Sequence, residues 1–305
     1  MNKADMIYDL SVIWSAVKEE FPYFDRLSFD WDEHYRTCLE QLLSIESEAA
    51  FHQLLSDFME RLNDGHTKYI PPREYNTRPP FVPPEPPSHA VQDGVLTIKI
   101  NDFLRDHAPL VREWLQSAPG VSLVRLDITD NIGGNTFYAA NVAELFISGL
   151  FHGCQKWTQV RNAVDAASLS QIACLGEDRL RQYMEDGLVE EEELEEARKT
   201  MGRTKYETYM DSFGAEGHEA LYAGPLHILI SGRTMSAAED FTAMFKSNHR
   251  GVLIGEPTYG STGTPYMIQL RCGGRAQVVS VGYRLLDGTE FIGCGIQPDR
   301  ASEAE

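Results

Sequence analysis

The sequence has few cysteines, few basic residues and no long apolar run, and each shortage narrows the class of protein. The five cysteines are odd in number and scattered, and no CxxC pair is present. This pattern argues against a disulfide framework or a zinc site and fits a reducing compartment. No apolar run approaches the ~20 residues needed to span a bilayer. The stretch Met1–Leu10 carries Asp5 and Asp9 and has no apolar export signal. We therefore expect a cytoplasmic protein with no membrane partner.

Basic residues are outnumbered, with 27 Lys and Arg against 46 Asp and Glu, which gives a net charge of -19. Nucleic acid is an improbable partner because phosphate binding needs a basic face. Much of the acid lies in residues 190–196, which we interpret as a solvated helix face. None of the nine histidines pairs with another at metal-ligand spacing. We therefore predict neither a metal nor an organic cofactor.

The order of apolar and turn-forming residues predicts an α/β protein with a helical N-terminal part. Apolar residues recur at helical spacing through the first seventy residues. Six prolines between Pro79 and Pro87 then indicate a linker. Beyond the linker, strands alternate with helices, which argues for an α/β core. The expected strands are Val95–Ile100, Val121–Ile128, Leu226–Ile230, Val252–Gly255 and a hairpin around Gly273-Gly274, and the expected helices are Tyr138–Phe146 and Ala237–Asn248.

The predicted organisation therefore has three parts. Residues 1–75 form an N-terminal helical bundle, residues 76–92 form the Pro-rich linker, and residues 93–305 form the core. A polar, acidic stretch at about 155–222 is expected to be a helical insertion in that core and to cap part of its cleft.

One strand–turn–helix junction places a serine where a nucleophile would be exposed. An apolar strand, Leu226–Ile230, delivers Ser236 to the first position of a helix. The free N–H groups and the dipole of that helix can stabilise developing negative charge. However, Ser236 and Glu239 also match a helix capping box. The residues alone leave both interpretations open.

Two further segments are suggestive but weak by themselves. Gly133-Gly134 follows a buried strand, and paired glycines let the backbone approach a ligand and point amides at an anion, although a tight turn explains them equally well. His66 lies in a helix-to-strand turn, where a lone histidine is more often structural than catalytic.

Taken together, these segments resemble the C-terminal-processing (tail-specific) serine peptidase family, which includes the tricorn protease core and the retinoid-binding repeats of a photoreceptor matrix protein. Five family motifs occur in the family's order between residues 62 and 299: "L-x-D-x-H-T" at Leu62–Thr67, "D-x-R-x-N-x-G-G" at Asp127–Gly134, "T-x-S-A-x-E" at Thr234–Glu239, "G-E-x-T-x-G" at Gly255–Gly260 and "G-x-G-I-x-P-D" at Gly293–Asp299.

The resemblance implies a ββα-spiral (ClpP/crotonase-like) core and assigns roles by position. Ser236 is implied as the nucleophile. One branch of the family uses a Lys as base, but Ser261 occupies that position here. The tricorn-like branch uses the histidine of the first motif, which is His66. The amide of Ala237 and that of Gly133 or Gly134 are implied as the oxyanion hole.

The chain departs from the family pattern at three positions and lacks one module. Gly65 stands where the tricorn core has a serine, and Thr129 stands where the glycine motif has an arginine. Ile292 stands where the family has the glutamate that orients the dyad, so Glu290 is the nearest substitute and Glu239 the competing carboxylate. The segment between Lys68 and Gln92 is too short for the peptide-binding module that family members often insert there.

The predicted function is hydrolysis of peptide bonds, in peptides or unfolded chain ends, through an acyl-enzyme on Ser236. Two alternatives remain open. A catalytically degenerate member of the family would bind an apolar ligand or peptide, and a different class of protein would use its helical segments as an interaction module. The oligomeric state is not predicted.

Overall fold

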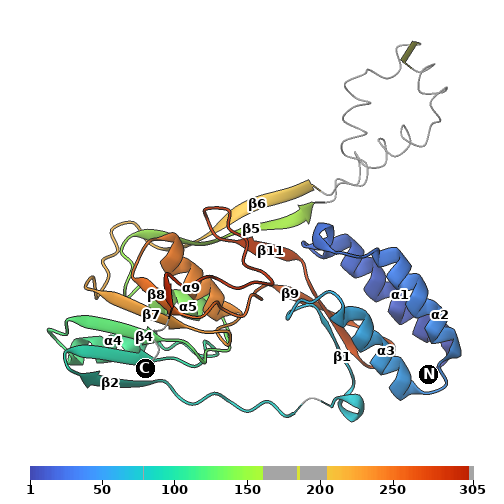
Figure 1. Cartoon of the computed structure of the whole chain (residues 1–305), viewed down its shortest axis with the longest axis horizontal. Helices are drawn as coiled ribbons and strands as arrows, with labels where there is room; N and C mark the ends of the chain where they lie inside the picture. The colour runs from blue at the N-terminus through green and yellow to red at the C-terminus, as the bar shows by residue number, and fades with distance from the viewer. Residues whose placement is uncertain (78, 161–183, 186–204, 302–305) are drawn as a thin grey trace. The chain divides into compact units, whose positions relative to one another are not determined.

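The computed structural model describes residues 1–77, 79–160, 184–185 and 205–301 (Figure 1). By internal contacts the chain forms two compact units, one of residues 1–156 and 209–305 and the other of residues 157–208. The candidate site lies wholly in the first unit.

The chain begins with three helices, as the apolar spacing predicts: α1 (Lys3–Glu20), α2 (Trp31–Ser44) and α3 (Glu48–Glu60). Each helix has a side-chain N-cap, supplied by Asn2, Asp30 and Ser47 respectively. Their apolar faces bury residues such as Leu10, Leu42 and Phe58 completely. Two short 3-10 turns, Phe24–Arg26 and Arg73–Tyr75, lie between and after the helices.

A six-stranded sheet forms the centre of the α/β part, in the order β12-β8-β7-β4-β3-β2. All of its strands run parallel except the edge strand β2, which pairs antiparallel with β3. Their bounds are β2 Ser88–Gln92, β3 Val95–Lys99, β4 Leu123–Asp127, β7 Leu226–Ile230, β8 Val252–Gly255 and β12 Arg300–Ala301. Because the strands are parallel, the loops that leave β4 and β7 emerge at the same edge.

Three helices belong to this sheet: α4 (Ala108–Ser117), α5 (Thr136–Ala143) and α9 (Ala237–Ser247). Figure 1 shows α5 and α9 together beside β7 and β8. The apolar core joins sheet and helices through fully buried side chains such as Leu126, Ile228, Val142 and Phe241. Since α9 is buried along nearly its whole length, its first residue has a fixed position at the sheet edge.

Two small sheets complete the fold. One has the order β1-β10-β9, with β1 Lys68–Ile70, β9 Pro265–Gln269 and β10 Arg275–Val279, and the other has the order β11-β5-β6, with β5 Leu150–Val160, β6 Lys205–Gly214 and β11 Val281–Arg284. The antiparallel pairing of β1 with β10 fixes the strand that begins two residues after His66.

The structure corrects the predicted organisation at two places. The predicted linker ends in a strand, β2, which comes after the last proline and lies at an exposed sheet edge where pairing on one side is sufficient. The two ends of the predicted helical insertion are strands, β5 and β6, which contain strand-favouring aromatic residues such as Phe151, Trp157 and Tyr209. Residues 215–222 of that insertion are turns and loop, and residues 161–183 and 186–204, which include the acidic run and most of the predicted cap, lie outside the described residues.

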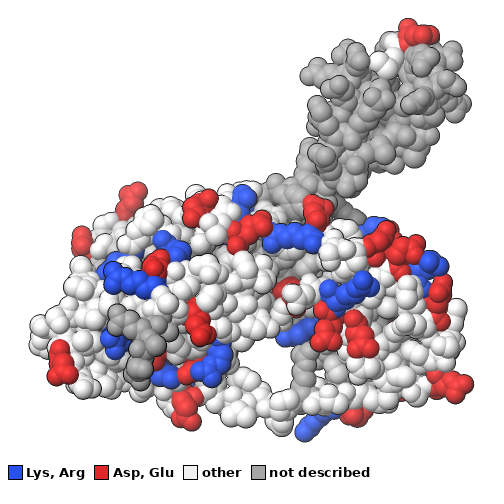
Figure 2. Space-filling model, viewed as in Figure 1, with Lys and Arg blue, Asp and Glu red and all other residues white. Residues whose placement is uncertain are grey.

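The described part of the chain has free thiols and a surface of mixed charge. Cys38, Cys154, Cys272 and Cys294 are free thiols. No helix in this part is long and apolar enough to cross a bilayer. The face drawn in Figure 2 carries acidic and basic side chains interspersed with one another.

Candidate active site

The turn that carries Ser236 is bound tightly to the neighbouring loop after β4. The hydroxyl of Thr234 donates to the carbonyl of Ile128 at 2.9 Å, and the hydroxyl of Ser231 donates to the carbonyl of Thr129 at 2.6 Å. The amide of Met235 donates to the carbonyl of Asn131 at 3.1 Å. These bonds fix the chain immediately before the nucleophile.

Ser236 stands at the N-cap position of α9, but its side chain does not cap the helix. It precedes α9 with φ 58° and ψ -131°, and its side chain makes no capping hydrogen bond. A positive φ is costly for any residue with a Cβ and is common at functional sites. The capping-box interpretation is therefore wrong, and the side chain of Ser236 is available for another partner.

That partner is His66, although 170 residues separate the two in sequence. The Nε2 of His66 lies 3.1 Å from the Oγ of Ser236. Two contacts from β10 fix the chain around this histidine. The side chain of Gln277 donates to the carbonyl of His66 at 2.8 Å, and the amide of Val279 donates to the hydroxyl of the adjacent Thr67 at 3.1 Å. The structure thus brings the predicted nucleophile and base into hydrogen-bonding contact.

The environment of His66 lowers the pKa of its imidazole below the ordinary value. Burial is the main cause because it disfavours the charged form, and Lys68 acts in the same direction. The nearby Asp64 carboxylate partly offsets both. A neutral imidazole is the form that accepts a proton from a nucleophile.

The other nitrogen of His66 contacts a residue that the sequence did not single out as catalytic. The Nδ1 lies 2.7 Å from the Oγ of Ser261, which in turn donates to Oδ1 of Asp64 at 3.1 Å. Ser261 is only 2% exposed. The signal that could have found it is its place in the family pattern, where the other branch has the basic lysine.

The structure does not bring Glu290 to His66. The carboxylate of Glu290 is half exposed and forms an ion pair with Arg26. Its prediction assumed a strand on which residues two apart share a face, but residue 290 lies in a loop. The Nδ1 position where an orienting carboxylate would bind is occupied by Ser261.

The competing carboxylate, Glu239, is buried and holds the loop that carries Ser261. It accepts from the hydroxyl of Thr258 at 2.6 Å, from the amide of Gly260 at 2.7 Å and from the amide of Ser261 at 2.8 Å. Burial raises the pKa of Glu239 to about 7, although these three donors act in the opposite direction. Glu239 therefore orders the loop and does not touch the imidazole directly.

The glycine loop lies directly against the nucleophile. Gly133 has φ +87°, and a Cβ placed on it would lie 2.5 Å from the Cβ of Ser236, so no other residue fits. The amide of Gly133 already donates to the side chain of Asn131 at 2.9 Å. Within the described residues, the amides of Gly134 and Ala237 have no acceptor. Of the three predicted donors, these two are free to receive an oxyanion.

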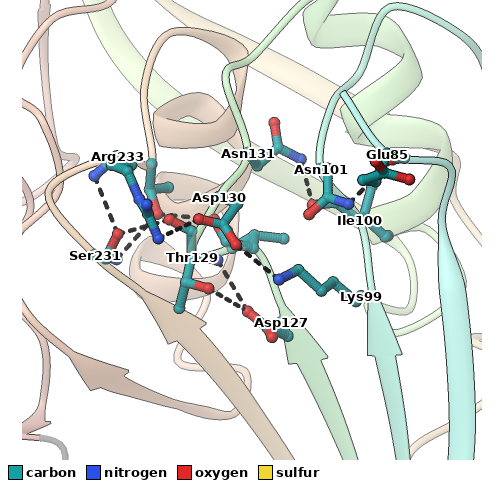
Figure 3. A network of polar contacts seen from close by, with 12 residues as sticks. Glu85, Lys99, Ile100, Asn101, Asp127, Thr129, Asp130, Asn131, Ser231 and Arg233 are labelled. Atoms are coloured by element: carbon teal, nitrogen blue, oxygen red, sulfur yellow. Dashed lines mark hydrogen bonds and ion pairs between the residues drawn. The ribbon is translucent and has the colours of Figure 1, made fainter. Parts of the chain in front are cut away.

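A polar network braces the sheet edge from which both loops emerge (Figure 3). Thr129, which replaces the arginine of the family pattern, donates to Asp127 through its hydroxyl at 2.6 Å. Asp130 pairs with Lys99 at 2.7 Å and with Arg233 of the nucleophile turn. The ends of β3, β4 and β7 are thereby joined through charged side chains.

Comparisons with known proteins identify the family and the fold. A family profile described as peptidase family S41 matches residues 94–302. The C-terminal processing peptidase of the Tetradesmus obliquus chloroplast is 29% identical over 89 residues, which are 29% of this chain and 19% of that protein. The aligned part is therefore about a fifth of the length of that relative. Since the profile covers more than half of the chain, the chain belongs to peptidase family S41.

Two solved structures share the fold. Mature CPAF, in complex with lactacystin, superposes with a TM-score of 0.70 at 12% identity and covers 98% of this chain and 94% of its own. The photosystem II D1 C-terminal processing protease has a TM-score of 0.57 at 13% identity and covers 98% of this chain and 93% of its own. The predicted α/β class and the resemblance to the processing peptidases are confirmed.

Among the described residues, no three His, Cys, Asp or Glu side chains lie close enough together to hold a metal ion.

Proposed function

We propose that this protein is a serine peptidase that hydrolyses peptide bonds through an acyl-enzyme on Ser236. The 3.1 Å contact between Ser236 Oγ and His66 Nε2 is the observation that carries the proposal. As the Oγ attacks the scissile carbonyl carbon, Nε2 takes its proton. The carbonyl oxygen becomes an oxyanion, and we assign its stabilisation to the amides of Ala237 and Gly134, which have no acceptor among the described residues.

The second half of the reaction uses the same groups. The protonated His66 returns its proton to the leaving amine as the C–N bond breaks, which leaves an ester on Ser236. A water molecule then attacks the ester while His66 acts again as base, and Ser236 is regenerated. No lysine is needed, because the position of the basic lysine is taken by Ser261 and the nucleophile contacts an imidazole.

We infer that the substrates are peptides or unfolded chain ends. Two of the proteins to which the chain is similar are named as C-terminal processing enzymes. The scattered cysteines support a cytoplasmic location. We also propose the ββα-spiral form of the fold, which is supported by the consecutive unit of β2, β3 and α4 that leads into β4.

A degenerate, ligand-binding member of the family is disfavoured by the state of the site. The sequence feature that favours this alternative is Gly65, because the tricorn core has a serine at the same position. The space beside Gly65 is not empty but holds the Ser261 hydroxyl, and the nucleophile and base remain in contact. We therefore retain hydrolysis as the function.

Digestion of a peptide library, followed by mass spectrometry of the products, tests the proposal. We expect the native protein to produce new termini and Ser236→Ala to produce none at equal concentration. Ser117→Ala, which removes an exposed serine at the end of α4, serves as the matched control and should digest the library normally. Identical products from the Ser236→Ala protein would show that hydrolysis does not use this serine.

A further inference from the structure

The hydrogen-bonded row of Asp64, Ser261 and His66 determines which ring nitrogen of His66 carries the proton. Ser261 has one hydroxyl hydrogen, and Oδ1 of Asp64, at 3.1 Å, is its acceptor. The Ser261 oxygen can then only accept from the Nδ1 of His66, which lies 2.7 Å away. The neutral imidazole must therefore carry its hydrogen on Nδ1. Its Nε2 lone pair is left facing Ser236, as a general base requires.

The reverse arrangement is electrostatically unfavourable. If Ser261 donated to Nδ1, its oxygen lone pairs would face the carboxylate of Asp64 without a hydrogen between them. The other oxygen of Asp64, Oδ2, is buried and has no hydrogen-bond partner within the described chain. Oδ1 therefore makes the contacts of this carboxylate, accepting also from the amide of His66 at 3.2 Å.

Gly65 is the residue that makes room for Ser261. A Cβ at position 65 would lie 2.9 Å from the Oγ of Ser261 and 3.2 Å from its Cβ. Both distances are shorter than the ~3.5–4.0 Å of an ordinary van der Waals contact. A side chain on residue 65 and the hydroxyl of Ser261 in its present place thus exclude one another. The glycine and the serine are a matched pair.

We propose that Ser261 and Asp64 are the positioning pair of this active site, with Ser261 occupying the volume that a side chain at position 65 would otherwise fill. Ser261 holds the imidazole ring in one tautomer, and Asp64 orients Ser261 and supplies the negative charge that stabilises the imidazolium formed during attack. This role, which the sequence assigned to Glu290, deepens the proposed function and rests on it.

The loop that carries Ser261 is itself fixed, so the pair is preorganised. The amide of Ser261 donates to the buried Glu239, and its carbonyl accepts from the amide of Ser236 at 3.0 Å. The nucleophile Ser236 and the positioning residue Ser261 are thus joined directly by one backbone hydrogen bond. Of the charged groups, Asp64 and Lys68 are those that act on His66.

The first test compares Ser261→Ala with Ser117→Ala by peptide hydrolysis at pH 8. Because Ser261 is buried and acts through His66, we expect kcat to fall roughly 10- to 100-fold with KM nearly unchanged. Ser117→Ala should match the native enzyme. Native kcat in a folded Ser261→Ala protein would overturn the positioning role while leaving the Ser236 mechanism intact.

The second test moves the serine hydroxyl from residue 261 to residue 65. Gly65→Ser alone should lower kcat because the new side chain displaces Ser261. In the double variant Gly65→Ser, Ser261→Ala, two close contacts of the new Cβ remain, with Tyr259 at 3.0 Å and with the Cβ of residue 261 at 3.2 Å. The Tyr259 ring is half exposed and can move. We expect the double variant to be several-fold faster than the product of the two single effects. A purely additive result would contradict the shared volume.

The third test does not depend on turnover. The ring signals of His66 are followed by NMR titration in the native protein, in Asp64→Asn and in Asp57→Asn, which removes an exposed carboxylate on α3. Loss of the Asp64 charge should shift the midpoint to lower pH, and Asp57→Asn should not. An unchanged midpoint in Asp64→Asn would overturn the pair even if no substrate were found.

Discussion

At the scale of single residues, Ser236 combines a half-buried nucleophile with an unfavourable backbone conformation. Its φ of 58° lies in the region that glycine adopts most easily. We expect Ser236→Gly to abolish hydrolysis and to raise the free energy of unfolding by about 1 kcal/mol, because the strain is removed. Denaturant unfolding of both proteins measures the change.

The control for this prediction is Ser117→Gly, at the C-terminal end of α4, where the backbone is helical. There a glycine should lower the free energy of unfolding. A Ser236→Gly protein destabilised to a similar extent would show that the positive φ at residue 236 is not a source of strain.

His66 provides the second prediction at this scale. Burial and Lys68 lower the pKa of its imidazole, and Asp64 only partly compensates. The midpoint of its NMR titration should therefore lie below the ordinary value of ~6.5, and His66→Ala should be inactive at pH 8. A midpoint above that value, or activity that appears only at alkaline pH and survives in His66→Ala, would remove His66 as the base.

The sequence made some of these residues predictable and not others. Ser236, His66 and the glycine loop belong to motifs whose order is specific, so their proximity could be predicted. The contact between Ser261 and His66 depends on a loop anchored by Glu239 and on the missing side chain of Gly65. Such a contact arises from three segments far apart in the chain, and no local pattern encodes it.

At the scale of elements, the first turn of α9 organises the loop at residues 258–261 through Glu239. Its pKa of about 7 exceeds the ordinary value, so the folded state holds a proton that the unfolded chain releases between roughly pH 4.5 and 7. This contribution to stability is present below that window and is lost as the pH rises through it. Between pH 5 and pH 7.5 it should fall by about 2 kcal/mol.

Glu239→Gln isolates this contribution, since glutamine does not titrate. The difference in unfolding free energy between pH 5 and pH 7.5, measured with denaturant, should be smaller in the variant than in the native protein. The variant should also lose activity at pH 8, because an amide cannot accept all three hydrogen bonds of the loop. Equal pH dependence in the two proteins would show that Glu239 does not titrate in this range.

The elements of the core were predictable because their periodicity is strong. Strands β3, β4, β7 and β8 and helix α9 form within a few residues of the expected bounds. The prediction of helix at the ends of the insertion is wrong, because the polar residues there are interspersed with aromatic and β-branched residues that favour the strands β5 and β6. Helix α4 was not predicted at all.

At the scale of the whole molecule, the active site is assembled from two parts of the chain. His66 follows the N-terminal helices, whereas Ser236 and Ser261 belong to the α/β part. Asp9 on α1 connects them, because this buried carboxylate accepts from the amides of Arg271 and Cys272 in the turn between β9 and β10 at 2.9 and 2.8 Å. The helices are thereby bound to the sheet that contains β1.

We expect Asp9→Ala to lower the free energy of unfolding by about 2–3 kcal/mol, because two amides lose a charged acceptor. Folded protein should keep kcat within a few-fold at low temperature and lose activity earlier on heating. Thermal unfolding and activity are measured together, with Asp57→Ala as control. A stability equal to that of the control would show that Asp9 does not join the two parts.

The most direct test of the central claim is the site of covalent labelling by a serine-directed fluorophosphonate, found by mass spectrometry of the intact protein and its peptides. We expect one adduct per chain, on Ser236, with a rate that falls at least a hundredfold in His66→Ala. No adduct, an adduct on another serine, or labelling of Ser236 at the native rate in His66→Ala would contradict a Ser236–His66 peptidase.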